Sequence, residues 1–243
     1  LQDRYPGRVF ARAVSVGCGN ASKEIRLLEA GLVEQIDLFE ISGTRIAQGQ
    51  ALLAQKGLAA RAQFYDDDVF ARDLDGYYDL VFWSHSLHHM MDVRAAVAWS
   101  RRVLRPCGVL VIDDYVGPSR LQWTPAQVDA ANDFIGEIAT QADRPLARMR
   151  RATSLGRARM YLKDPSEAPQ SHMIQDACRH ELDGFQLTSL GGALIHICAP
   201  LVLAIANGEE QHPLLDVLIE ADAHAEAAGH IHFAFGIWDK TAV

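Results

Sequence analysis

Three histidines and a pair of carboxylates stand out as groups that could move a proton. His85, His88 and His89 are spaced i, i+3 and i+4, so they would share one face of a helical turn. Imidazole has an ordinary pKa of about 6.5, which suits proton transfer near neutrality. The same spacing, with Asp113 and Asp114 nearby, could also assemble a metal site. A packed turn without catalytic function is the third interpretation, and the spacing alone leaves all three open.

A glycine-containing segment near the N-terminus could bind a nucleotide-like ligand. Gly17 to Asn20 forms a G-x-G turn between an apolar run and a helix, and glycines there admit a ligand that a Cβ atom would exclude. The third glycine of the dinucleotide-binding pattern is missing, because position 22 is a serine. Glu40 follows Gly17 by 23 residues, where a carboxylate can accept hydrogen bonds from both ribose hydroxyls.

These groups must be positioned by strands and helices that alternate along the chain. Apolar runs of strand length at 12–16, 35–39, 61–65, 78–83 and 109–113 alternate with amphipathic helices that begin near Ser22, Ser42 and Asp92, with Ser22 as an N-cap. This is the pattern of a doubly wound α/β fold with a parallel sheet. Since ligands bind beyond the carboxyl ends of such strands, Glu40, the acids 66–68 and His85 should face one crevice.

The alternation stops after Tyr115. Helices are predicted near 125–139 and 171–181, and two further strands at 185–190 and 230–238. We predict one domain over 1–243, in which 115–182 is a helical insertion that caps the substrate. The longest apolar run, 191–206, is interrupted by His196 and Pro200 and is shorter than the roughly 20 residues of a membrane span, so no membrane association is expected.

Five motifs in order along 12–118 resemble those of the class I S-adenosylmethionine-dependent methyltransferases: the G-x-G turn, Glu40, Asp68-Val69, the segment 84–90, and Pro106 to Gly108. The resemblance implies a Rossmann-like sheet of seven mostly parallel strands, with the last strand antiparallel and helices on both faces. It also implies S-adenosylmethionine as the cofactor. The glycine turn would contact its methionine part, Glu40 its ribose, and Asp68 its adenine, with Asp67 as the alternative acid.

The cofactor-binding residues that follow from this resemblance are Gly17, Cys18, Gly19, Asn20, Glu40, Ile41, Asp67, Asp68, Val69, Ser84 and His85. Methyl transfer from a sulfonium is an in-line displacement, and a hydroxyl or protonated amine acceptor also requires a base. His85 is the first candidate because it lies nearest to its strand end, and His88 and Tyr115 complete the predicted catalytic set. No metal ligand is predicted.

Composition limits the partners. Lys plus Arg number 23 and Asp plus Glu number 31, which gives a net charge of −8 and argues against a nucleic-acid partner. Seven cations without an intervening acid, which could clamp an anionic acceptor or form a solvated connector, are Arg144, Arg148, Arg150, Arg151, Arg157, Arg159 and Lys163. Four scattered cysteines suggest reduced thiols and a cytoplasmic location. A monomer or homodimer is expected.

The predicted function is methyl transfer to oxygen or nitrogen of a small metabolite, such as a sugar, a nucleotide-linked sugar or a natural-product intermediate. A noncatalytic S-adenosylmethionine-binding regulatory partner is one alternative. A nicotinamide-dependent oxidoreductase on a similar sheet is another. The missing third glycine and the lack of a Tyr-x-x-x-Lys pair argue against the oxidoreductase.

Overall fold

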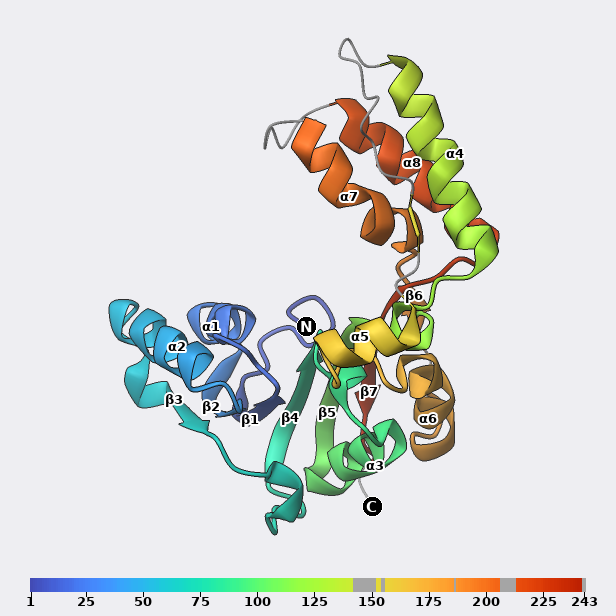
Figure 1. The fold of residues 1–243 in the computed structure, drawn as a ribbon. Helices are drawn as coiled ribbons and strands as arrows, with labels where there is room; N and C mark the ends of the chain where they lie inside the picture. The colour runs from blue at the N-terminus through green and yellow to red at the C-terminus, as the bar shows by residue number, and fades with distance from the viewer. Residues whose placement is uncertain (142–151, 154–155, 186, 206–212, 242–243) are drawn as a thin grey trace.

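A seven-stranded sheet forms the central layer of the protein (Figure 1). The computed structural model describes residues 1–141, 152–153, 156–185, 187–205 and 213–241. The strands lie in the order β3-β2-β1-β4-β5-β7-β6. Their bounds are Phe10–Val16 (β1), Val33–Phe39 (β2), Ala62–Tyr65 (β3), Tyr78–Ser84 (β4), Leu104–Tyr115 (β5), Thr188–Ser189 (β6) and Phe233–Asp239 (β7). β7 runs antiparallel to both neighbours and the other pairs are parallel, which confirms the predicted sheet.

Helices cover both faces of this sheet, as predicted. α1 (Ser22–Glu29) and α2 (Gly43–Gln55) bury Ile25, Leu28 and Leu53 with the residues of one face. α3 (Val93–Val103) and α6 (Ile174–Glu181) pack with the other face and with each other. The two apolar layers hold the strands in place, so the strand ends form a fixed frame for the groups that follow them.

All three helices begin within one residue of their predicted positions. Ser42 and Asp92 are N-caps, and their side chains accept hydrogen bonds from the backbone N–H groups of Arg45 and Ala95. The prediction of Ser22 as an N-cap is wrong, because Ser22 is the first helical residue. The chain leaves the glycine turn through the left-handed residue Ala21, whose φ is 55°. The N-cap of α1 is therefore Ala21, one residue before the predicted position.

Three helices form a separate lobe, called here the cap: α4 (Pro125–Gln141), α7 (Ala193–Ile205) and α8 (Pro213–Ala227) (Figure 1). Its apolar interior includes Phe134 and Ile138 of α4, Val202 of α7 and Leu218 of α8. The segment 115–182 therefore supplies one cap helix, whereas its α6 packs on α3. The other two cap helices come from the connection between β6 and β7. That the cap covers a substrate stays a prediction.

The junction of α7 with α8 depends on one buried carboxylate. Asp222 of α8 accepts hydrogen bonds from the backbone N–H groups of Gly192, Leu194 and Ile195, at 2.6, 2.8 and 3.2 Å. It thus satisfies the unpaired donors at the start of α7. Gly191 precedes this turn with a φ of 61°, and a Cβ atom there would lie 2.9 Å from the Asp222 carboxylate. The two cap helices are therefore fixed to each other where they leave the sheet.

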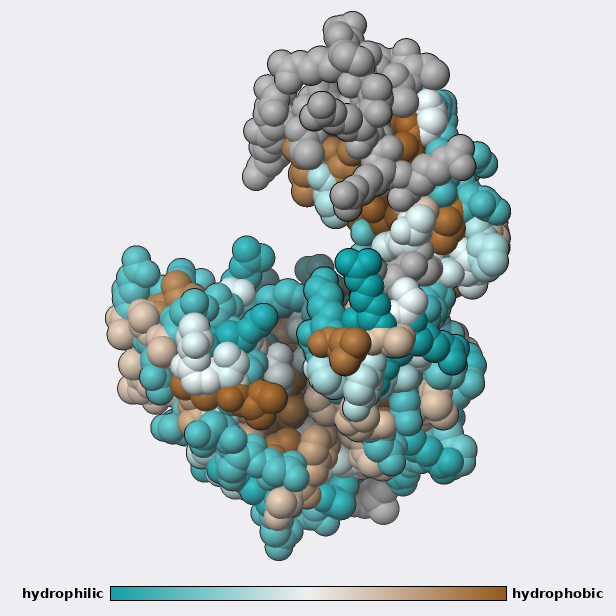
Figure 2. Space-filling model, in the orientation of Figure 1, coloured by the Kyte–Doolittle hydropathy of each residue, from teal (hydrophilic) through white to brown (hydrophobic). Residues whose placement is uncertain are grey.

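The surface of the cap is partly apolar. Brown surface gathers on its described part (Figure 2), and Ile195, Leu203 and Ile219 are exposed apolar side chains of α7 and α8. Of the predicted basic stretch, Arg144, Arg148, Arg150 and Arg151 lie outside the described residues. Arg157, Arg159 and Lys163 are exposed on α5 (Arg157–Lys163). Among the residues that the structure describes, no helix has the length and apolarity needed to cross a bilayer.

Candidate active site

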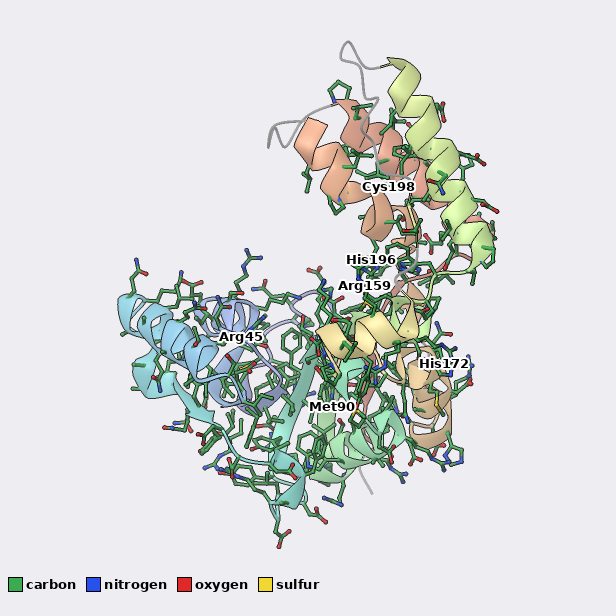
Figure 3. The ribbon with its side chains drawn as sticks, in the orientation of Figure 1. Arg45, Met90, Arg159, His172, His196 and Cys198 are labelled. Atoms are coloured by element: carbon green, nitrogen blue, oxygen red, sulfur yellow. The ribbon has the colours of Figure 1, made fainter. Side chains whose placement is uncertain are left out.

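A cavity of about 580 Å³ lies at the carboxyl ends of the first four strands. Arg45 and Met90 line it from α2 and from the turn after β4 (Figure 3). The cavity brings together residues that the sequence placed at separate strand ends. The predicted cofactor-binding residues in its lining are Gly17, Glu40, Ile41, Asp67, Asp68, Val69 and His85.

The glycine turn and Glu40 form one hydrogen-bonded unit. Oε2 of Glu40 accepts from the backbone N–H of Gly19, and Oε1 accepts from that of Ser42, each at 2.8 Å. Gly17 has a φ of 67°, and a Cβ atom there would lie 3.0 Å from Cβ of Ser86. A carboxylate offers about four lone-pair positions, so Glu40 can hold the turn and still accept from a diol.

The acids after β3 have different partners. Asp67 makes a two-pronged ion pair with Arg72, at 2.8 and 2.7 Å, and this hydrogen bonding lowers the pKa of Asp67. Oδ1 of Asp68 accepts from the N–H of Phe70 at 2.9 Å, which caps the short turn that begins at Val69. Because Asp67 is engaged by Arg72, the geometry favours Asp68 as the acid available to a ligand.

Ile41 is 89% exposed although it is a large apolar side chain in the cavity lining. Such exposure costs hydrophobic free energy that a flat apolar ligand surface would recover. Four other predicted residues, Cys18, Gly19, Asn20 and Ser84, are described but lie outside the cavity lining. Oδ1 of Asn20 accepts from the N–H of Ser22, Ser84 accepts from Nζ of Lys23 at 2.7 Å, and burial raises the pKa of the Cys18 thiol.

The backbone of His85 continues the hydrogen bonding between β4 and β5 beyond the end of β4. Its N–H donates to the carbonyl oxygen of Asp113 at 2.8 Å, its φ is 53°, and Nε2 lies 4.0 Å from Oδ2 of Asp113. Partial burial and the nearby Lys23 charge lower the pKa of His85. It therefore presents a largely neutral imidazole to the cavity at pH 7.

His88 forms a buried pair with Asp114. Oδ1 of the fully buried Asp114 lies 2.5 Å from Nδ1 of His88 and accepts from the N–H of Tyr115, while Oδ2 accepts from the N–H groups of Ser86 and Leu87. Burial opposes protonation, but the hydrogen bond and charge of Asp114 outweigh it and raise the pKa of His88. In the neutral form that keeps its proton on Nδ1, Nε2 carries the lone pair, and the raised pKa makes this nitrogen a stronger base. Nε2 lies 3.8 Å from Oε1 of Glu167.

The sequence did not indicate this pair. In the sequence, Asp114 was considered together with Asp113 for a metal site, and Glu167 was not singled out. The signal that could have found it is the alternation of side-chain direction along a strand. Asp113 pairs with Ser84 at the end of β4, so the next residue, Asp114, points to the other face of the sheet. There it is buried beneath the turn 85–89. A buried acid beneath a histidine turn is unusual unless it is paired.

Tyr115 lies in an aromatic cluster where the cap joins the sheet. Its hydroxyl donates to the carbonyl oxygen of Pro118 at 2.9 Å, and burial raises the pKa of the phenol. Its ring makes edge contacts with His196, His232 and Phe233. Figure 3 places His196 at the base of the cap and Cys198 farther into it. The hydroxyl proton of Tyr115 is thus used in a structural hydrogen bond. The ring of Tyr115 forms part of the wall between the sheet and the cap.

His232 in this cluster should make the protein acid-sensitive. Its side chain is fully buried, and burial together with the His196 charge lowers its pKa to about 3. The unfolded chain binds this proton below about pH 6.5. Stability is therefore lost as the pH falls from about 6.5, by up to about 1.4 kcal/mol per pH unit. Urea unfolding of the native protein and of His232→Gln at several pH values should show a shallower slope for the variant. His180→Gln, at an exposed histidine, is the control, and equal slopes for all three proteins would contradict the prediction.

The strand order, the glycine turn and the carboxylate after β2 define a Rossmann-like α/β domain with a cavity at its strand ends. Residues 14–112 match the family model described as a methyltransferase domain. This match and the methyltransferase relative described below agree with the resemblance to the class I S-adenosylmethionine-dependent methyltransferases, a family that uses S-adenosylmethionine as its cofactor. The resemblance found in the sequence is confirmed.

Three similar proteins illustrate the range of the fold. A 27-O-demethylrifamycin SV methyltransferase of Amycolatopsis mediterranei (strain S699) is 29% identical over 143 residues, which are 57% of this chain and 51% of that protein. The chain thus spans about half the length of this curated relative. The [4+2]-cyclase SpnF has a TM-score of 0.59 at 17% identity, over 100% of this chain and 79% of its own. Phosphoethanolamine N-methyltransferase 2 of Haemonchus contortus, solved with S-adenosyl-L-methionine, has a TM-score of 0.60 at 12% identity, over 100% of this chain and 51% of its own. At these identities the two structures indicate the fold alone.

Proposed function

We propose that this protein transfers the methyl group of S-adenosylmethionine to a hydroxyl oxygen of a small acceptor, with His88 as the base. The observation that carries the proposal is the His88–Asp114 pair beside the cofactor cavity. Its Nδ1 proton is held by a buried carboxylate, so its Nε2 lone pair is available for proton transfer. A histidine oriented in this way by an acid is the arrangement that activates hydroxyl nucleophiles in other enzymes.

The cavity residues fit the cofactor. Glu40 can accept from the ribose hydroxyls, Asp68 can accept from the adenine amine, and exposed Ile41 can pack on the adenine plane. The lack of a Cβ atom at Gly17 lets the glycine turn pack closely against Ser86 at the wall of the cavity, where the methionine part would lie. When bound there, S-adenosylmethionine supplies a methyl group on a sulfonium, ready for in-line displacement.

The chain's own residues supply orientation and proton transfer. As the acceptor oxygen bonds to the methyl carbon and the carbon–sulfur bond breaks, Nε2 of His88 takes the hydroxyl proton. Asp114 keeps the Nδ1 proton in place and stabilises the imidazolium that forms. His85 faces the same cavity as a largely neutral imidazole, which suits a hydrogen bond to the acceptor. A neutral amine acceptor would attack without such a base, so the pair favours oxygen over nitrogen.

The acceptor class we propose is a hydroxylated natural-product intermediate. The relative from Amycolatopsis, a 27-O-demethylrifamycin SV methyltransferase, supports an oxygen acceptor. The cap and the Tyr115 aromatic cluster offer apolar and aromatic surface for such a molecule. An anionic acceptor is the alternative, and Arg157, Arg159 and Lys163 on α5 are the described cations that would hold it.

Cofactor binding can be tested apart from turnover. S-adenosylhomocysteine should raise the melting temperature and NADH should not, because only a ligand that binds the folded state stabilises it. Incubation of the protein with methyl-labelled S-adenosylmethionine and a panel of hydroxylated natural products, read by mass spectrometry, then tests transfer. A shift with NADH alone would favour the oxidoreductase. Binding without transfer to any acceptor would favour the regulatory partner, a real alternative because this fold also occurs in a cyclase.

Glu40→Gln should weaken S-adenosylmethionine binding by about 10- to 100-fold, since hydrogen bonds to a charged group contribute about 1.5–3 kcal/mol. Glutamine keeps the size of the side chain but presents an amide N–H₂ to the Gly19 or Ser42 donor. Isothermal titration calorimetry measures the effect. Glu34→Gln, at an exposed position of β2, is the matched control. An unchanged Kd for Glu40→Gln would remove Glu40 from the cofactor site.

A further inference from the structure

His88, His89 and Glu167 converge beside the cofactor cavity. One ligand atom from each lies within 4.8 Å of the other two, and Nε2 of His88 is 3.8 Å from Oε1 of Glu167. The two histidines occupy the short turn after β4, and Glu167 comes from the segment between α5 and α6. Two imidazoles and a carboxylate are a ligand set that suits Zn²⁺ and similar divalent metals.

The Nδ1 atom of each imidazole already has a hydrogen-bond partner. Nδ1 of His88 pairs with Asp114, and Nδ1 of His89 lies 3.1 Å from the carbonyl oxygen of Ser166. Histidines that ligate a metal almost always donate their other ring N–H to a carboxylate or a backbone carbonyl, which fixes the tautomer and ring orientation. Both histidines have this arrangement before any metal is bound, and it leaves their Nε2 lone pairs for a metal.

The spacing is close to that of a tetrahedral site. Ligand atoms with bonds of about 2.1 Å to Zn²⁺ lie about 3.4 Å apart. The His88–Glu167 separation of 3.8 Å is near this value, and the 4.8 Å limit for the whole set requires only a small approach of the side chains. His89 and Ser166 also line the cofactor cavity, so a fourth coordination position would face that cavity.

We propose that His88, His89 and Glu167 form a divalent-metal site of the zinc type, and that metal bound there competes with methyl transfer. Metal and acceptor proton would require the same Nε2 lone pair of His88. An occupied site would thus remove the base and inhibit the enzyme. The binding part stands on the ligand geometry alone, whereas the competition part rests on the proposed function.

Direct binding tests the first part. Chelator-treated full-length protein is titrated with Zn²⁺ against a chromophoric chelator, in a Cys107→Ser background because Cys107 is an exposed thiol that could bind zinc by itself. One Zn²⁺ per chain should bind, and His89→Gln and Glu167→Gln should each weaken the affinity by at least about tenfold. His172→Gln, at an exposed histidine bonded to Ser119, should leave it unchanged. No stoichiometric binding, or equal affinity in all four proteins, would overturn the site.

The competition part has its own readout. Zn²⁺ should slow methyl transfer by the native protein, and Glu167→Gln should require at least about tenfold more Zn²⁺ to halve its own metal-free rate. Metal binding that leaves the native rate unchanged, or that raises it, would overturn the competition. If no acceptor is methylated at all, the proposed function fails while the binding titration still decides the metal site.

Discussion

His88→Gln is expected to lower methyl transfer by about 10²- to 10⁴-fold, the usual contribution of a positioned base. Glutamine can still donate a hydrogen bond to Asp114 but has no nitrogen that accepts a proton at neutral pH. Since His88 lies outside the cofactor cavity lining, the Kd for S-adenosylmethionine should change little. Single-turnover rates with saturating cofactor, together with calorimetric Kd values, separate the two quantities.

His85→Gln is the comparison that decides between the two histidines. His85 lies nearer to the strand end and was the first candidate from the sequence, but its Nε2 is 4.0 Å from Asp113, beyond hydrogen-bond reach. We expect a smaller loss of rate for His85→Gln than for His88→Gln. The opposite order would transfer the role of base to His85. An equal loss of cofactor affinity and rate in His88→Gln would make His88 a structural residue.

Asp114→Asn is expected to reduce the free energy of unfolding by about 3–5 kcal/mol, the cost of breaking a buried ionic pair. The Asp114 carboxylate accepts hydrogen bonds from the N–H groups of Ser86, Leu87 and Tyr115 as well as from His88. An amide in its place would direct an N–H₂ group at one set of these donors. Urea unfolding at pH 7 measures the change, with an unchanged m-value as the sign that the transition is still two-state.

Asp113→Asn provides the matched control at the neighbouring position. The Asp113 side chain is about one-third exposed, and its carboxylate lies 4.0 Å from His85. Exposed pairs of this kind contribute about 0–1 kcal/mol, so a small change is expected. If the two variants lose similar stability, Asp114 does not hold the turn 85–89 in the way that its hydrogen bonds indicate.

The sheet and the gathering of polar residues at one cavity could be predicted because their signals are local. Each strand is an apolar run, and candidate site residues such as Glu40 and Asp68 follow within three residues of their strand ends. Parallel strands then bring those residues to one edge without further information. The N-cap of α1 was displaced by one residue because the left-handed Ala21 replaces the expected geometry, and a backbone conformation of this kind has no strong sequence signal outside glycine and asparagine.

The His88–Asp114 pair and the cap could not be predicted because they depend on tertiary contacts. His88 and Asp114 are 26 residues apart, and they meet only because β5 is in register with β4. Glu167 reaches the turn after β4 from a segment without regular structure. The interior of the cap joins α4 to α7 and α8, whose apolar stripes do not reveal which helix will cover them.

The way the cap is assembled also bears on attempts to change the acceptor by exchanging parts between related enzymes. Its three helices come from two excursions of the chain, one after β5 and one between β6 and β7. A transplanted α4 alone would leave behind the partners of Phe134 and Ile138 and bring an uncovered apolar face into its new host. A chimera should therefore carry both excursions, together with Asp222 and the start of α7 that it fixes, as a single unit of exchange.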